Sequence, residues 1–162
     1  MRLYSFVNAN YLKHVQHGLQ TAHAVAELYN KYPEETNEPN CVRYDLLNDW
    51  ARNHKTIIIL DGGDCQDLYD IVEFLIKNDR DLKLPFSYFK EDARSLHNAL
   101  TAVAVVVPRE IYDVKLDVNN RLWTNDTGYI LSNSDNTVRP HYWPNRATQE
   151  FYDLLKSKGL AR

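Results

Sequence analysis

The sequence lacks the features that mark membrane proteins and disulfide-rich secreted proteins. No apolar stretch reaches the ~20 residues that a membrane-spanning helix needs, and residues 1–7 contain no long apolar signal core. The two cysteines, Cys41 and Cys65, are too few for a disulfide framework and have no metal-ligand spacing. The sequence therefore predicts a cytoplasmic protein that does not contact a membrane.

Strong charge of either sign is also missing. The formal net charge is -3, which argues against a protein whose main task is to grip a phosphate backbone. The chain has 162 residues, of which 44% are hydrophobic, enough for one domain with a substantial core and too few for two ordinary domains. Internal repeats and low-complexity tracts are absent as well, so we expect a single globular domain.

Short apolar runs and helical patterns alternate along the first 108 residues. We predict strands at residues 3–7, 55–60, 86–90 and 101–107, and helices at 18–31, 44–52 and 66–77. Asp64 is placed to cap the third helix. The run 101–107 is apolar after Thr101 and rich in valine, which is typical of a strand buried on both faces. These elements predict a three-layer α/β fold, with a mixed four-stranded sheet and helices on both faces.

Two further patterns refine this prediction. The apolar residues of the first helix share one face, as in an amphipathic helix: Leu19, Ala22, Val25, Ala26 and Tyr29. After Pro108 the pattern changes to alternating strand-like segments at 112–118, 121–123 and 129–131, an irregular loop at 139–146 and a helix at 147–158. We interpret residues 1–108 as an α/β core and residues 109–162 as a strand/helix appendage packed on it.

Four motifs in the first 108 residues occur in the order found in one enzyme family. They are the helix start Gly18-Leu19-Gln20-Thr21-Ala22-His23-Ala24, where the family has Ala-Ala-Gln-x-x-His-Ala, a polar turn after Trp50, an aromatic strand ending in Asp92-Ala93, and Thr101 opening an apolar strand. Residues 1–108 therefore resemble the type-2 peptidyl-tRNA hydrolases. The resemblance implies the family's α/β fold and hydrolysis of the ester that joins a peptide to tRNA.

The resemblance also implies a catalytic site at the strand ends. Asp92 would orient or deprotonate a water, and Thr101 would hold that water or the substrate carbonyl. Gln20, with Gln16 or a nearby histidine, would donate hydrogen bonds to the oxyanion. We expect the side chains of Gln20, His23, Asp92 and Thr101 to approach one another. Such a reaction needs no metal ion and no other cofactor.

The sequence departs from the family where the family has a lysine. Gln16 stands there, and a glutamine carries no positive charge, so we expect turnover to be weak. Lys13, His14 and His17 are alternative donors, and Arg94 replaces the glycine that follows Asp-Ala in the family. His14, His17 and His23 are not spaced to converge on a metal ion from one helix.

A structural interpretation stands beside each functional one, because Asp92 could cap a turn, Thr101 could simply start a strand and His23 could be a core histidine. The rival function is a catalytically inactive binding module. Its interaction surface would be formed by Arg139, Tyr142, Trp143 and Arg146. These residues could stack on RNA bases or anchor a protein interface. The structural alternative is that they pack the appendage onto the core. The partners therefore stay open: tRNA or other RNA, another protein, or a second copy of the chain in a homodimer.

Overall fold

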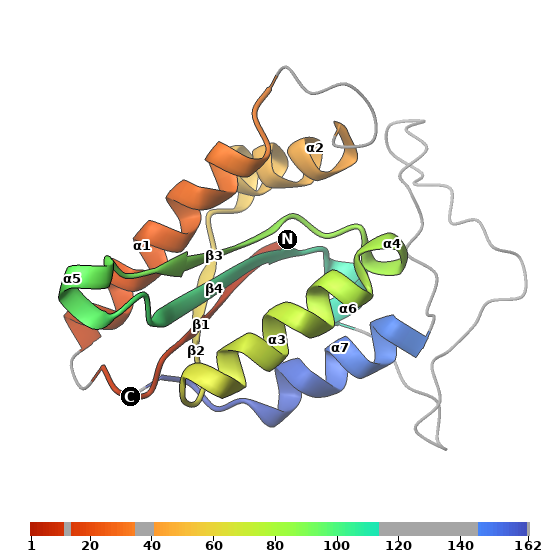
Figure 1. The fold of residues 1–162 in the computed structure, drawn as a ribbon. Coiled ribbons are helices and arrows are strands. Elements are labelled where there is room, and N and C mark those ends of the chain that lie inside the picture. Colours follow the sequence, from red (N-terminus) through yellow and green to blue (C-terminus); the bar gives the residue numbers. More distant parts are fainter. Residues whose placement is uncertain (12–13, 35–40, 114–145, 162) are drawn as a thin grey trace, which may run out of the picture.

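A computed structural model describes residues 1–11, 14–34, 41–113 and 146–161. Its centre is a four-stranded sheet made of β1 (Arg2–Val7), β2 (Ile57–Asp61), β3 (Phe86–Lys90) and β4 (Leu100–Val107), in the order β2-β1-β4-β3 (Figure 1). β1 pairs in parallel with β2 and antiparallel with β4, and β3 is antiparallel to β4. The predicted mixed four-stranded sheet is therefore confirmed.

Strand β4 lies inside the sheet and is buried on both faces, as its valine-rich sequence predicts. Its side chains alternate between two hydrophobic clusters. Val103, Val105 and Val107 belong to one cluster. Ala102, Ala104 and Val106 belong to the other, where the two small alanines leave room for a helix to approach the strand closely.

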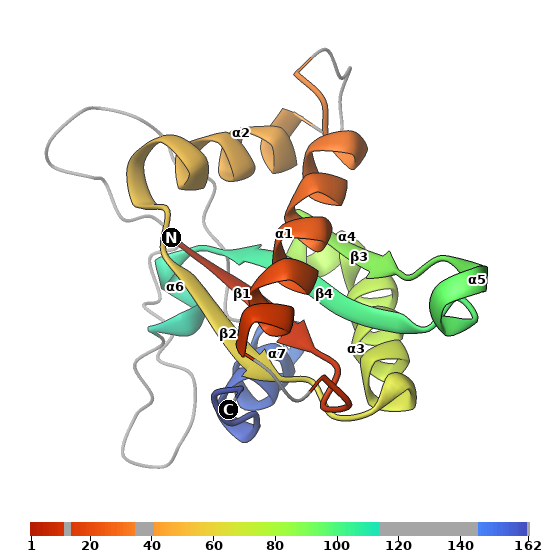
Figure 2. The same ribbon diagram turned by 90° about the vertical axis from the view of Figure 1, so that its left-hand side faces the viewer.

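Helices cover both faces of the sheet (Figures 1 and 2). One face carries α1 (His14–Lys31) and α2 (Cys41–Asp49), which continues into the single π-helical turn η1 (Trp50–His54). The opposite face carries α3 (Cys65–Lys77) and α7 (Arg146–Ser157). Short helices complete the fold: α4 (Asp79–Leu82), α5 (Ala93–Leu96) and α6 (Arg109–Tyr112). None of the described helices has the length and apolarity needed to cross a membrane.

Helix α3 begins at the predicted cap. The Asp64 side chain accepts hydrogen bonds from the backbone N–H groups of Gln66 and Asp67, at 2.7 and 3.0 Å. The Asp67 carboxylate in turn accepts a hydrogen bond from Asp64 N at 2.9 Å. This capping box satisfies N–H groups that the first turn of a helix cannot pair internally.

Helix α1 packs on the sheet through a different face from its apolar stripe. Its buried residues are His17, Gln20, Thr21, Ala24 and Leu28, whereas Leu19 and Tyr29 are 53% and 43% exposed. The buried polar groups are tolerated because they find partners across the interface. Ser5 and Thr21 share a hydrogen bond of 2.8 Å between their hydroxyls. The amphipathic pattern was therefore a wrong guide to the packed face.

The C-terminal segment contributes to the core and to the sheet edge. Phe151 of α7 is fully buried in the cluster formed with α3 and the sheet. The last described residues then run antiparallel to β2, where Asp61 N donates to Gly159 O at 2.9 Å and Ala161 N to Ile59 O at 3.1 Å. The strands predicted between residues 112 and 131 fall almost entirely outside the described residues, except that Tyr112 ends α6.

Candidate active site

Two residues that the sequence assigns to the site lie in direct contact at the end of β4. Thr101 Oγ1 donates a hydrogen bond to Gln20 Oε1 at 2.8 Å. The two side chains are almost fully buried, at 1% and 3% exposure. Thr101 is the second residue of β4 and Gln20 lies in the second turn of α1, so the packing of α1 on the sheet joins residues that are far apart in the chain.

Glu91 holds the other end of the Gln20 amide. Gln20 Nε2 donates to Glu91 Oε1 at 2.7 Å, and the Tyr11 hydroxyl donates to the same oxygen at 3.3 Å. Both ends of the amide are thus engaged, the oxygen by a hydroxyl and the nitrogen by a carboxylate, which fixes the amide orientation. We call Tyr11, Gln20, Glu91 and Thr101 the polar cluster.

The polar cluster keeps its tyrosine neutral. Burial raises the pKa of Tyr11 to about 12, and the negative charge and hydrogen bond of Glu91 act in the same direction. The phenol is therefore a donor at neutral pH. The backbone next to it is also tied down, because His17 Nε2 lies 2.6 Å from Tyr11 O. A carbonyl can only accept, so Nε2 of His17 carries a hydrogen.

Asp92 lies beside the polar cluster and caps a helix. Its carboxylate accepts a hydrogen bond from Arg94 N at 2.6 Å, as the N-cap of α5, and the residue is exposed. The carboxylate that binds Gln20 is instead that of Glu91, which the sequence analysis missed. Strand alternation gives no signal for it, because Glu91 follows the last residue of β3 and the pairing register shifts between Phe89 and Lys90.

His23 and the other candidates take different places. The His23 ring stacks on the Phe89 ring with centroids 4.4 Å apart, at the side of the polar cluster. His14, Gln16 and Arg94 are exposed. Arg146 begins α7, where its Nε donates to Glu150 Oε1 at 2.6 Å. Lys13, Arg139, Tyr142 and Trp143 lie outside the described residues.

A hollow of about 440 Å³ opens next to the polar cluster. Its lining consists of Tyr11 and His17, Asp61 at the end of β2, residues 159–161, and Val7 with Ala9 after β1. The hollow gives small molecules a way to reach the Tyr11 side of the polar cluster. It lies at the ends of the parallel strands β1 and β2, a common place for ligands in open α/β sheets.

No protein-family model and no curated protein matches this chain. Membership of the type-2 peptidyl-tRNA hydrolases therefore stays a prediction from the motifs. Within the described part of the chain, no group of three His, Cys, Asp or Glu side chains is arranged to hold a metal ion. The chemistry of the described residues is that of carboxylates, an amide and hydroxyls, which can position a water and donate hydrogen bonds.

Proposed function

We propose that the protein slowly hydrolyses the ester between a peptide and tRNA at the polar cluster and the adjoining Asp92. The observation that carries this proposal is the hydrogen bond between Thr101 and Gln20. The motif resemblance assigns both residues to one site, and the fold brings them together although they stand in different elements.

Each residue is assigned a role from its hydrogen-bonding groups. The Gln20 amide nitrogen carries two hydrogens, and one of them goes to Glu91, so we assign the second to a developing oxyanion. Glu91 is a positioning residue in this scheme, because it acts by holding Gln20. Asp92, exposed at the start of α5, is the carboxylate that orients or deprotonates water.

Slow turnover is expected because the site lacks a fixed charge at residue 16. Gln16 is exposed on the first turn of α1, one turn before Gln20. A cation there would stabilise the oxyanion more in the transition state than in the ground state. Losing one donor of this kind typically lowers the rate by ~10²–10³.

The test compares matched variants on a model peptidyl-tRNA. Asp92→Asn removes the carboxylate but keeps a side chain that caps helices well, so it separates catalysis from folding. We expect Asp92→Asn to abolish turnover and Gln16→Lys to raise it. Asp70→Asn is the control, because Asp70 is an exposed carboxylate on α3, on the opposite face of the sheet. Turnover that survives Asp92→Asn would contradict the proposal.

The same preparations decide between the two function classes. RNA affinity that falls as salt rises, with no turnover by the wild type or Gln16→Lys, would favour the inactive binding module. In that case Trp143→Ala is expected to remove the affinity, together with changes at Arg139, Tyr142 or Arg146. Absence of both activities would leave a protein partner as the remaining proposal.

A further inference from the structure

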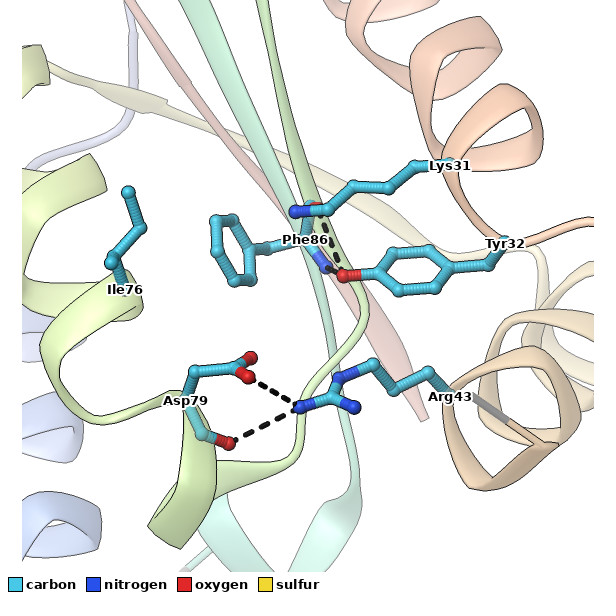
Figure 3. Close-up of a pocket in the computed structure, with 6 residues that line it drawn as sticks. All are labelled: Lys31, Tyr32, Arg43, Ile76, Asp79 and Phe86. Carbon is cyan, nitrogen blue, oxygen red and sulfur yellow. Dashed lines mark hydrogen bonds and ion pairs between the residues drawn. The ribbon is translucent and has the colours of Figure 1, made fainter. Parts of the chain in front are cut away.

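A second hollow lies at the other end of the contact between α1 and β3. It measures about 310 Å³ and is lined by six residues: Lys31, Tyr32, Arg43, Ile76, Asp79 and Phe86 (Figure 3). We call these six residues the anion pocket. Lys31 ends α1, eleven residues after Gln20, which separates the pocket from the polar cluster by about 16 Å along the helix. The pocket is therefore a different place from the candidate active site.

Arg43 is buried in this pocket with part of its guanidinium unsatisfied. The residue is 8% exposed. Its Nη2 donates to Asp79 Oδ2 at 2.7 Å and to Asp79 O at 3.3 Å, whereas its Nε, although buried, has no hydrogen-bond partner among the described residues. Figure 3 shows this Nε edge turned toward the space below Tyr32 and Phe86. A buried charged donor without an acceptor is costly, so an acceptor in this space would be stabilised.

Lys31 brings a second cation to the same space. Its Nζ donates to Phe86 O at 3.0 Å and stands 3.7 Å from the centre of the Phe86 ring. Although much of Lys31 is exposed, burial of its ammonium group lowers its pKa, and the charge of Arg43 lowers it further while Asp79 opposes both. Two cations therefore share one carboxylate, which leaves one positive charge in excess.

We propose that the anion pocket binds the carboxylate or phosphate group of a small molecule, with Arg43 Nε and Lys31 Nζ as the donors. An oxyanion bound in this pocket supplies the acceptor that Arg43 Nε lacks and balances the excess charge. The Phe86 ring and the Ile76 side chain form an apolar wall for the remainder of the ligand. The volume is at the lower end of the ~300–1,000 Å³ found for small-molecule pockets, which fits a small metabolite.

The proposal is tested by titrating the whole protein with acetate and with inorganic phosphate at low ionic strength. Binding is monitored by NMR, and a titration with chloride serves as the reference. We expect one saturable site, whose affinity falls about tenfold or more in Lys31→Gln, because one charge-assisted hydrogen bond is lost. Arg80→Gln, which removes an exposed positive charge from α4 outside the pocket, is expected to bind as the wild type does.

Two further variants keep the test decisive. Asp79→Asn removes the only carboxylate of the anion pocket and leaves an oxygen that accepts from Arg43 Nη2, so affinity is expected to rise. Arg43→Lys keeps the charge but removes Nε, so affinity is expected to fall. If Arg43→Lys does not fold, the test depends on the other two variants: affinity should fall in Lys31→Gln and rise in Asp79→Asn.

The relative affinities of the two anions identify the ligand class, a carboxylate or a phosphate. The proposal is overturned if neither anion saturates a site, or if Arg80→Gln weakens binding as much as Lys31→Gln does. Because the anion pocket contains no residue of the polar cluster, either result is independent of peptidyl-tRNA hydrolysis.

Discussion

Replacing Thr101 by valine removes one buried hydroxyl and leaves the shape of the side chain nearly unchanged. In the wild type this hydroxyl donates to Gln20 Oε1 at 2.8 Å, with Phe89 O at 3.3 Å as a longer neighbour. In the variant, Gln20 Oε1 stays buried and has lost that donor. An acceptor left in this state costs about 1–3 kcal/mol of unfolding free energy. For a chain of this length each kcal/mol lowers the melting temperature by ~2–4 °C.

Urea denaturation of Thr101→Val measures this loss, with Thr56→Val as the control. Thr56 is exposed, and its hydroxyl makes only a 3.5 Å contact with His54 O, so its replacement should stay within ~0.5 kcal/mol of the wild type. A double-mutant cycle with Gln20→Met should return a coupling of ~0.5–3 kcal/mol. If Thr101→Val is as stable as the control, the buried hydrogen bond at the centre of the polar cluster is refuted.

Three other predictions address the remaining parts of the structure. Asp64→Ala should lower the unfolding free energy by about 1 kcal/mol in urea denaturation, because α3 loses its N-cap, while Asp64→Asn should be close to neutral. Glu91→Gln should lower the pKa of Tyr11 from about 12 in an absorbance titration referenced to Tyr11→Phe, because the negative charge and its hydrogen bond act together to raise it. Since the folded pKa is raised, the stability that the neutral phenol contributes is present below pH ~10 and is lost as the pH rises through about 12. Phe151→Ala should cost ~3–5 kcal/mol in a single cooperative thermal transition, with exposed Lys156→Ala as control, because Phe151 is fully buried against the sheet.

The sheet could be predicted from the sequence because its strands are short, apolar and separated by clear breaks. Residues 101–107 are apolar after the first position and rich in valine, which is typical of a strand covered on both faces. The cap of α3 was equally clear, since Asp64 stands directly before a helical pattern. The helices α4, α5 and α6 were missed because each has four residues, too few to show a helical period.

The packed face of α1 could not be read from hydrophobicity alone. His17, Gln20 and Thr21 are buried, and the partners that make this tolerable, such as Ser5, come from another element. Tertiary hydrogen bonds of this kind leave no periodic signal in the helix itself.

The candidate site shows the same limit. Gln20 and Thr101 could be paired through motif order, and their contact is in the structure. Glu91 was overlooked because the motif drew attention to Asp92, its neighbour. Which of two adjacent carboxylates turns toward α1 depends on how β3 ends, and the pairing register shifts between Phe89 and Lys90. Such a shift changes which side chains share a face and cannot be deduced from residue types.

The most direct measurement for the account as a whole is the rate of peptidyl-tRNA ester hydrolysis by the wild type, Asp92→Asn and Gln16→Lys. The account predicts slow turnover by the wild type, none by Asp92→Asn and faster turnover by Gln16→Lys, with Asp70→Asn equal to the wild type. Turnover that is unchanged in Asp92→Asn, or absent from the wild type and Gln16→Lys alike, would contradict it.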